Sequence, residues 1–244
     1  MTDRTLTNRT VLVTGASRGI GRALVEEALR RGAKRVYAGT RTPIDEIDER
    51  VTPLLLDVTD AAQIRRAAED VGSLDLLVNN AGVGLYDDLS DPALLERHLT
   101  VNLFGPLRIT TAFLPQLVRS RGAVVNNVSL TAFAPFPAMP SYAISKAAAF
   151  SLTQSLRAAL AGHGVRVHAV LTGPTDTDMT RGLEIPMATP ESVARAIFDG
   201  VGRGEEDIFP DPMSEGIAES WRSGRIKQFE RELAGYAAPM QIAV

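Results

Sequence analysis

The sequence predicts an α/β fold, a single domain in which a doubly wound parallel sheet of about seven strands carries helices on both faces. Short β-branched runs alternate with longer amphipathic runs almost from end to end, which is the pattern of repeated strand and helix units. The short runs are apolar on both sides, as strands covered by two helical layers must be. The 244 residues contain no Pro-, Gly- or Ser-rich linker, which favours one domain over 1–244.

The individual elements follow from this alternation. Strands are expected at 10–15, 34–40, 51–58, 74–80, 122–129, 165–172 and, with a weaker pattern, 207–210. Helices are expected at 21–32, 60–71, 91–119, 141–162 and 190–203. The C-terminal segment at about 214–236 has the pattern of one more amphipathic helix, packed on the body of the protein or on a partner chain. Right-handed crossovers are expected between the parallel strands.

Composition and charge exclude several classes of protein. The net charge of -3 and the pI of about 5.7 provide no basic surface for nucleic acid or for an anionic membrane. The absence of cysteine excludes disulfides and thiolate catalysis and suits a reducing cytoplasm. The sequence has neither the pattern of a signal peptide nor an apolar run that could span a bilayer. His98, His163 and His168 lack metal-ligand spacing, so no metal is expected. We therefore expect a cytoplasmic protein.

A glycine-rich turn follows the first expected strand. The stretch "TGASRGIG" places Gly15, Gly19 and Gly21 between that strand and the first helix. Glycines at this position let the backbone approach a pyrophosphate, which the N–H groups and the positive end of the helix stabilise. The spacing G-x-x-x-G-x-G differs from the common G-x-G-x-x-G fingerprint. Its place after the first strand nevertheless predicts nucleotide binding.

The end of the second strand bears on which nucleotide is bound. An acidic residue there would hydrogen-bond the ribose 2′-hydroxyl of NAD, but this chain has Thr40 followed by Arg41, with Arg18 inside the glycine turn. Two guanidinium groups suit a 2′-phosphate, because arginine makes bidentate, charge-assisted hydrogen bonds. The pattern favours NADP(H). The alternative is that Arg41 is a solvated residue leaving the strand.

A tyrosine and a lysine lie four residues apart in "SYAISK", at the start of the helix expected at 141–162. The spacing places Tyr142 and Lys146 on one helical face, which alone is most often a solvated surface. The chain also contains "NNAG" at 79–82 and "VNNVS" ending in Ser129. With "TGASRGIG", and in this order, these motifs resemble the short-chain dehydrogenase/reductase family in its small, single-domain, Rossmann-like form. The resemblance spans roughly residues 8–210.

The resemblance implies a catalytic group and a cofactor site. It implies that Ser129, Tyr142 and Lys146 form a catalytic triad, and that Asn102 helps to hold a water-linked proton relay. Where the family often has proline after the sixth strand, this chain has Thr172. The implied cofactor positions are Gly15, Ser17, Arg18, Gly19, Ile20, Gly21, Thr40, Arg41, Asp57, Val58, Asn79, Ala81, Gly82, Tyr142, Lys146, Gly173, Pro174, Thr175 and Thr177.

These residues suit the reduction of a carbonyl group. The nicotinamide supplies a hydride, and Tyr142 can supply the proton. A free phenol has a pKa of about 10, and we expect the ammonium of Lys146 to lower it. Ser129 would donate a hydrogen bond to the substrate oxygen as negative charge develops on it. We therefore expect a reversible NADPH-dependent carbonyl reductase with Tyr142 as general acid and base.

The residues around the catalytic pair suggest an apolar ketone or aldehyde as substrate. A lid at about 173–190 and the segment before Tyr142 would form a mainly hydrophobic pocket. The pocket residues expected are Thr131, Phe133, Phe136, Met139, Leu183, Ile185 and Met187, several of which could instead belong to the core or to an oligomer contact. The family resemblance implies a homodimer or homotetramer, formed through the helices at 91–119 and 141–162.

Three other functions stay open. A 3-oxoacyl-thioester or polyketide-type ketoreductase is disfavoured by a short lid without a positive cluster. A non-catalytic NADP sensor would have no need of the triad. A dehalogenase-like relative would replace the lysine and fill the cofactor pocket, whereas this chain has Lys146 and all three glycines.

Overall fold

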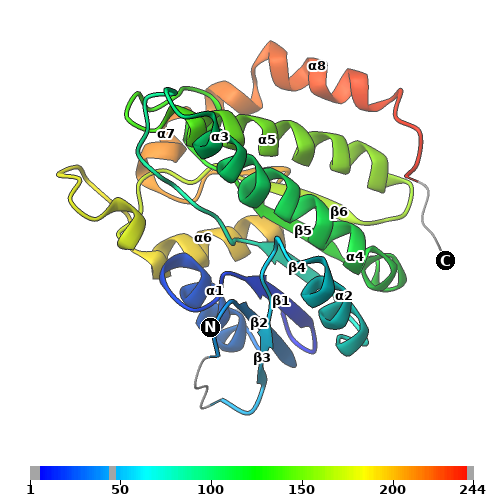
Figure 1. Cartoon of the computed structure of the whole chain (residues 1–244). Coiled ribbons are helices and arrows are strands. Elements are labelled where there is room, and N and C mark those ends of the chain that lie inside the picture. The colour runs from blue at the N-terminus through cyan, green and yellow to red at the C-terminus, as the bar shows by residue number, and fades with distance from the viewer. Residues whose placement is uncertain (1–5, 44–47, 241–244) are drawn as a thin grey trace.

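Seven parallel strands form one sheet in the order β3-β2-β1-β4-β5-β6-β7, as the computed structural model describes it for residues 6–43 and 48–240 (Figure 1). The strands are β1 (Thr10–Thr14), β2 (Arg35–Thr40), β3 (Val51–Leu55), β4 (Leu76–Asn79), β5 (Ala123–Asn127), β6 (Arg166–Val170) and β7 (Asp207–Ile208). β1 lies between β2 and β4, so Val11 pairs with both Val36 and Leu76. The predicted fold class is confirmed. Several strands are shorter than predicted at their carboxyl ends, where the chain leaves the sheet to form the functional loops.

Helices cover both faces of the sheet (Figure 1). α1 (Gly19–Arg30) and α6 (Pro190–Arg203) pack on one face, over a core that includes Val13, Val36 and Phe198. α2 (Ala61–Asp70), α4 (Gly105–Ser120) and α5 (Pro140–Ala161) cover the other face, over a core that includes Leu77 and Phe113. This double burial explains why the strands are apolar on both sides.

The helix expected at 91–119 is interrupted. It consists of α3 (Pro92–Leu99), a π-helical turn η1 (Thr100–Phe104) and α4. The carboxylate of Asp91 caps α3 by accepting a hydrogen bond from the backbone N–H of Ala93 (2.9 Å). The π turn contains Asn102, which is buried. Single π turns inside α-helices are frequent at functional sites, and this one carries the fourth predicted catalytic residue.

The single C-terminal helix expected at about 214–236 is in fact two helices, which corrects that prediction. α7 (Pro212–Arg222) and α8 (Arg225–Ala234) are separated at Gly224, where a Cβ atom would lie 2.6 Å from the carbonyl oxygen of Ser220. α8 lies alongside α5 (Figure 1). Two 3-10 turns, η2 (Leu130–Ala132) and η3 (Asp178–Thr180), complete the elements. Among the described residues, no helix combines the length and apolarity that crossing a membrane requires.

Candidate active site

The predicted site residues follow the carboxyl ends of the four central strands. Gly15 follows β1, Ala81 follows β4, Ser129 follows β5 and Gly173 follows β6. Strand order reverses between β1 and β4, and in doubly wound sheets ligands bind in the crevice at such a switch point. The topology therefore brings together residues that are more than 150 positions apart.

The glycine turn has the geometry of a phosphate cradle. Gly15 and Gly19 have φ angles of +66° and +53°, which favour glycine. A Cβ atom on Gly21 would lie 2.0 Å from the carbonyl oxygen of Gly15. Arg18, the N-cap residue of α1, makes no side-chain capping bond, and the first turn has no acidic residue. Backbone N–H groups at this helix start thus have no side-chain cap, so the turn fits a pyrophosphate.

Three polar side chains form a ladder across the central strands. Thr172 Oγ1 donates a hydrogen bond to Asn127 Oδ1 (2.6 Å), and Asn127 Nδ2 donates to Asn80 Oδ1 (3.0 Å). Asn80 Nδ2 donates in turn to the carbonyl oxygens of Thr14 (3.1 Å) and Gly15 (3.3 Å). This polar ladder (Thr172, Asn127, Asn80) connects the end of β6 to the glycine turn. Thr172, the residue that departs from the family pattern, thus donates the first hydrogen bond of this ladder.

The predicted catalytic pair, Tyr142 and Lys146, lies in the first turns of α5. Lys146 Nζ donates a hydrogen bond to the backbone carbonyl of Asn127 (2.8 Å) and lies 5.5 Å from the centroid of the Tyr142 ring. The side chain of Ser129 is near enough to the phenol of Tyr142 to lower its pKa, and Ser129 Oγ accepts a hydrogen bond from Thr131 Oγ1 (3.0 Å). Ser129, Tyr142 and Lys146 therefore come together as predicted.

Burial has the largest effect on the pKa values of Tyr142 and Lys146. Although part of the Tyr142 side chain stays exposed, burial raises the pKa of its phenol to about 12, against a smaller lowering by the hydrogen bond with Ser129. Burial lowers the pKa of Lys146 to about 8. The expectation that Lys146 brings the pKa of Tyr142 below its ordinary value is therefore corrected, because desolvation is the larger influence. Lys146 is the group that titrates near neutral pH.

Asn102 clamps the loop that follows β4. Its Oδ1 accepts a hydrogen bond from the backbone N–H of Val83 (2.9 Å), while its Nδ2 donates to the carbonyl of Val83 (2.8 Å) and to Ser145 Oγ (2.9 Å). A Cβ atom on Gly82 would lie 3.3 Å from Asn102 Oδ1 and 3.8 Å from Lys146 Nζ. Asn102 thus lies near Lys146, and its part in a proton relay stays a prediction.

Two further anchors hold the catalytic helix, and the sequence analysis missed both. His98 is fully buried, and its ring packs edge-on against Tyr142 at 6.3 Å between centroids. Its Nε2 accepts from the backbone N–H of Leu85 (3.0 Å). The carboxylate of Asp87 accepts hydrogen bonds from the hydroxyl and the N–H of Ser141, capping α5 in place of Met139, whose side chain cannot. No sequence signal identifies these long-range partners.

The remaining predicted cofactor residues lie around the same edge. Asn79 is buried and donates to Asn126 Oδ1 (2.8 Å) and Thr110 Oγ1 (3.1 Å), so its amide braces the central strands. Thr40 is buried and donates to the carbonyl of Thr42 (2.7 Å), while Arg41 is exposed at the end of β2. The other residues placed at this edge are Ser17, Ile20, Asp57 and Val58.

The two ends of the lid are joined. The N–H of Ala188 donates to the carbonyl of Pro174 (3.0 Å), and the N–H of Asp176 donates to the carbonyl of Ala188 (2.9 Å). A Cβ atom on Gly173 would lie 2.4 Å from the carboxylate of Asp211, which accepts a hydrogen bond from the Gly173 N–H (2.7 Å). The lid base, including Thr175 and Thr177, is thus fixed.

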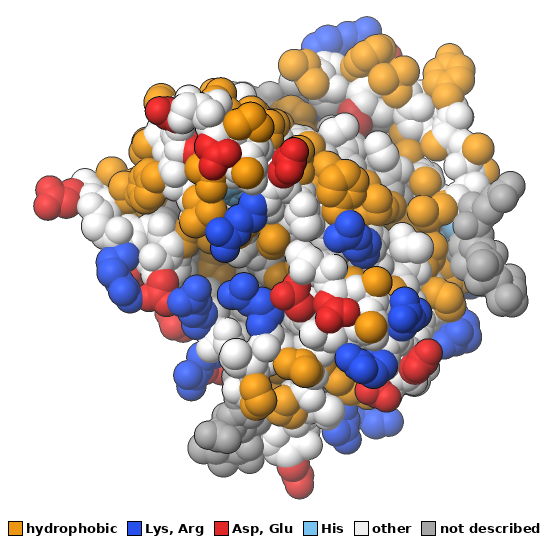
Figure 2. Space-filling model, in the orientation of Figure 1, with side chains coloured by type: hydrophobic (Ala, Val, Ile, Leu, Met, Phe, Trp, Pro, Cys, Tyr) orange, Lys and Arg blue, Asp and Glu red, His pale blue; other side chains and the backbone are white. Residues whose placement is uncertain are grey.

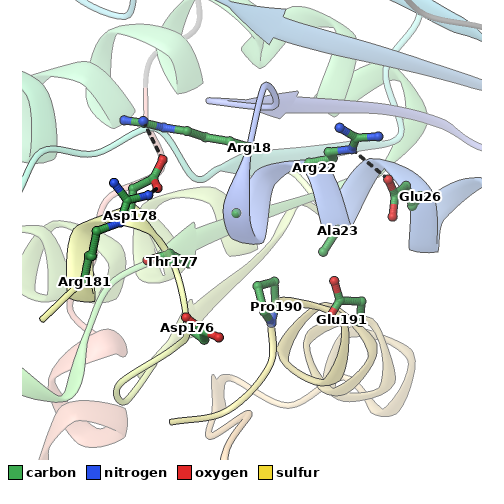
Figure 3. A pocket seen from close by; sticks show the side chains of 11 residues that line it. Arg18, Arg22, Ala23, Glu26, Asp176, Thr177, Asp178, Arg181, Pro190 and Glu191 are labelled. Carbon is green, nitrogen blue, oxygen red and sulfur yellow. Dashed lines mark hydrogen bonds and ion pairs between the residues drawn. The ribbon is translucent and has the colours of Figure 1, made fainter. Parts of the chain in front are cut away.

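A cavity of about 550 Å³ lies between α1, the lid and the start of α6 (Figure 3). Arg18 from the glycine turn reaches across it to Asp178 of the lid, with 2.7 Å between Nη1 and Oδ2. Arg181 also pairs with Asp178. The lining carries both signs of charge and includes none of the predicted catalytic residues Ser129, Tyr142 and Lys146.

The predicted substrate residues do not line one common pocket wall but differ in burial and in packing. Met139 is buried, and its Cε, with Met179 Sδ, lies about 3 Å from where a Cβ atom on Gly84 would be. Phe133, by contrast, stacks on Trp221 at 4.6 Å and meets Phe150 edge-on at 5.2 Å, so its ring belongs to an aromatic cluster of the core. Leu183 and Met187 are half-buried, whereas Phe136 and Ile185 are exposed.

Comparison with known proteins shows which family the chain resembles. Residues 9–187 match the family model described as short chain dehydrogenase. The oxidoreductase UcpA of Escherichia coli K12 is 35% identical over 214 residues, covering 79% of this chain and 81% of that protein. A short chain dehydrogenase from Burkholderia cenocepacia J2315, solved in complex with NADP, has a TM-score of 0.85 and 36% identity over 93% of this chain and 98% of that one. A 3-oxoacyl-[acyl-carrier protein] reductase from Brucella melitensis has a TM-score of 0.71 and 26% identity, covering 81% and 85%.

Proposed function

Because the chain belongs to the short-chain dehydrogenase/reductase family of oxidoreductases, we propose that it reduces an apolar ketone or aldehyde to the alcohol with NADPH. The observation that carries the proposal is the meeting of Ser129, Tyr142 and Lys146 beside a glycine turn that fits a pyrophosphate. The Burkholderia neighbour solved with NADP supports the choice of cofactor.

NADPH, when bound, would supply the hydride that the substrate carbon accepts. The glycine turn and the start of α1 would hold the phosphates, with Arg18 and Arg41 at the 2′-phosphate. Ser129 would donate a hydrogen bond to the carbonyl oxygen and orient it. Tyr142, which stays protonated at neutral pH because its pKa is about 12, would donate its proton to that oxygen.

Lys146 would supply the positive charge that stabilises the forming phenolate of Tyr142. With a pKa of about 8, Lys146 is mostly charged at neutral pH and can also pass a proton on. Asn102, His98 and Asp87 would hold these groups in place through the loop after β4 and the start of α5.

The preference for an apolar substrate rests on the methionines near the catalytic helix. Met139 is buried, and Met179 of the lid approaches the same point on Gly84. A second candidate is reduction of a 3-oxoacyl thioester, which the likeness to the Brucella reductase supports. A short lid whose Arg181 is paired with Asp178 offers little to a carrier protein.

Absorbance at 340 nm tests the proposal. NADPH, and separately NADH, would be offered with aryl ketones, aliphatic ketones, aldehydes, keto acids and a 3-oxoacyl thioester. We expect oxidation of NADPH with apolar ketones or aldehydes, and Tyr142→Phe should reduce the rate about 10²- to 10⁴-fold. Tyr236→Phe is the matched control, because Tyr236 is 87% exposed and lies beyond α8.

Three results would count against the proposal. Equal turnover of charged and apolar ketones would contradict the apolar pocket. Turnover of the thioester alone would favour the second candidate. Tight NADPH binding without turnover of any carbonyl compound would favour a sensor.

A further inference from the structure

α8 carries an apolar row on its outer side. Ile226, Phe229, Leu233 and Tyr236 are 71%, 53%, 51% and 87% exposed. Their spacing of three and four residues places them along one side of the helix and its continuation. We call these four residues the α8 stripe. In the space-filling view, hydrophobic side chains gather over the top of the molecule, where α8 lies (Figure 2). A contiguous apolar row of this kind marks an interaction site.

The other side of α8 is held by buried charges. Lys227 is 2% exposed, and its Nζ lies 2.6 Å from Asp207, 2.9 Å from Glu230 and 3.0 Å from Glu206. Arg157 joins the same group through Asp207 (2.6 Å). Turning α8 to bury its stripe would separate Lys227 from Asp207 and Glu206, the two carboxylates outside the helix, and leave charged groups buried with fewer partners, which is costly. The ion pairs of Lys227 therefore hold α8 in the orientation in which the α8 stripe faces solvent.

We propose that a second copy of this chain covers the α8 stripe, the two α8 helices pairing antiparallel about a two-fold axis. Arg225 and Glu232 lie seven residues apart on one edge of the stripe, 3.5 Å from each other. In an antiparallel pair centred near Phe229, Arg225 of each chain faces Glu232 of the partner subunit. A two-fold axis makes both contacts at once. A parallel pair in register would instead put like charges opposite each other, which is unfavourable.

The charges of α8 favour a copy of the chain over an anionic membrane. The exposed charges along the helix are of mixed sign, with Arg225 and Arg231 beside Glu232, and the one lysine is buried. A helix that binds anionic lipids would instead carry lysine and arginine along its polar face. Mixed charges beside an apolar row are typical of helices that pair with each other.

The interface differs from the one that the family resemblance implies. That expectation placed the contact on the helices at 91–119 and 141–162, whose exposed large apolar residues in the structure are Phe104 and Ile144, each 42% exposed. α8 has 10 residues, about three helical turns. We expect a pair of helices this short to bury less than the roughly 800 Å² per partner of a standard stable interface. We therefore expect a reversible dimer that forms at micromolar concentration. The pairing does not depend on the proposed reaction.

Sedimentation velocity over a range of concentrations of the full chain tests this interface. The wild-type protein should shift from monomer to dimer as its concentration rises. Phe229→Ser should raise the dimer dissociation constant at least about tenfold without lowering the unfolding temperature. Phe104→Ser is the matched control, an exposed phenylalanine on the other helix pair, and should leave the dimer unchanged.

Charge reversal tests the antiparallel geometry. Arg225→Glu and Glu232→Arg should each weaken the dimer, because each sets like charges opposite one another. An equimolar mixture of these two variants should dimerise again, since both contacts between unlike chains are then complementary. A wild-type chain that stays monomeric at all concentrations would overturn the proposal, and so would a dimer lost in Phe104→Ser but kept in Phe229→Ser. Phe229-dependent binding of the monomer to phosphatidylserine vesicles would also overturn it.

Discussion

Arg18 and Asp178 form an ion pair between the glycine turn and the lid, across 160 residues of sequence (2.7 Å). Arg18 is also the residue in that turn whose guanidinium suits the 2′-phosphate of NADP. If Arg18 contacts the 2′-phosphate as proposed, the carboxylate of Asp178 competes with that phosphate for the same donor groups. Both side chains are largely exposed, so the competition is weak and reversible.

This competition predicts opposite effects for the two residues. Asp178→Asn should tighten NADPH binding about two- to fivefold, because an exposed ion pair contributes at most about 1 kcal/mol. Arg18→Ala should weaken NADPH binding and leave NADH binding nearly unchanged, since NADH has no 2′-phosphate. Titration by fluorescence or calorimetry measures both. Asp176→Asn, which removes a neighbouring lid carboxylate, is the control. Equal losses for NADPH and NADH in Arg18→Ala would rule out contact with the 2′-phosphate.

The pKa values of the catalytic pair predict the pH profile of carbonyl reduction. Tyr142, with a pKa of about 12, keeps its proton throughout the working range. Lys146, with a pKa of about 8, loses its positive charge as pH rises through that value. We expect kcat/KM to be level below about pH 8 and to fall above it, because the forming phenolate then lacks its cation. kcat/KM reports groups of the free enzyme.

Lys146→Arg separates this explanation from others. Arginine stays charged because its pKa exceeds about 12, so the descending limb near pH 8 should disappear even if the rate is lower. A limb that stays near pH 8 in this variant would show that another group titrates. A wild-type profile that rises through pH 8 would contradict the assigned sign.

The polar ladder predicts a role for the hydroxyl of Thr172. Thr172→Val keeps the shape of the side chain but removes the donor to Asn127 Oδ1, and leaving that acceptor unsatisfied costs about 1–3 kcal/mol. We expect a lower free energy of unfolding and weaker NADPH binding, because the ladder supports both the glycine turn and the strand end whose carbonyl holds Lys146. Urea unfolding and cofactor titration measure the two effects.

Thr172→Ser provides the matched control for the ladder. It keeps the hydroxyl and loses one methyl group, so cofactor binding should stay near the wild-type value. If valine and serine weaken NADPH binding equally, the methyl group and not the hydrogen bond matters at this position.

Sequence patterns predicted most of the fold because hydrophobic periodicity and glycine placement are local signals. The strand–helix alternation placed all seven strands, and the catalytic motifs named Ser129, Tyr142 and Lys146, which the fold brings together. Long-range partners were not predictable. Asp87 caps α5 from 54 residues away, and Phe133 leaves the expected substrate pocket for Trp221.

The structure departs from the predicted helices at two further places, and hydrophobic periodicity could detect neither of the two physical causes. A π turn changes the phase of a helix by one residue without a distinctive composition, so the interruption around Asn102 looked like part of one long helix. At Gly224 the backbone is extended (φ −71°, ψ 150°), and a Cβ atom there would make a close approach of 2.6 Å to the carbonyl oxygen of Ser220, so this turn between α7 and α8 requires glycine. Such an approach depends on where the chain turns next, not on the residues within the helix.

The buried charges beneath α8 predict a strong dependence of stability on Asp207. Burial by itself raises the pKa of Asp207, but Arg157 and Lys227 outweigh burial and leave the pKa lowered. The stabilisation from this carboxylate is therefore complete at pH 7 and is lost as pH falls through the lowered pKa. Asp207→Asn leaves two buried cations with fewer partners, so the free energy of unfolding at pH 7 should fall by about 3–5 kcal/mol.

Urea unfolding at several pH values checks this prediction. The difference between wild type and Asp207→Asn should be largest near neutral pH. It should shrink as pH falls below about 4, the ordinary pKa of an aspartate in the unfolded chain, and on through the lowered pKa of the folded state, because the carboxylate is progressively protonated over that range. Glu26→Gln is the control, because the ion pair of Glu26 with Arg22 is exposed on both sides and contributes little. A small loss in Asp207→Asn that does not vary with pH would mean that Arg157 and Lys227 find other partners. The buried charges would then not be what fixes the orientation of α8.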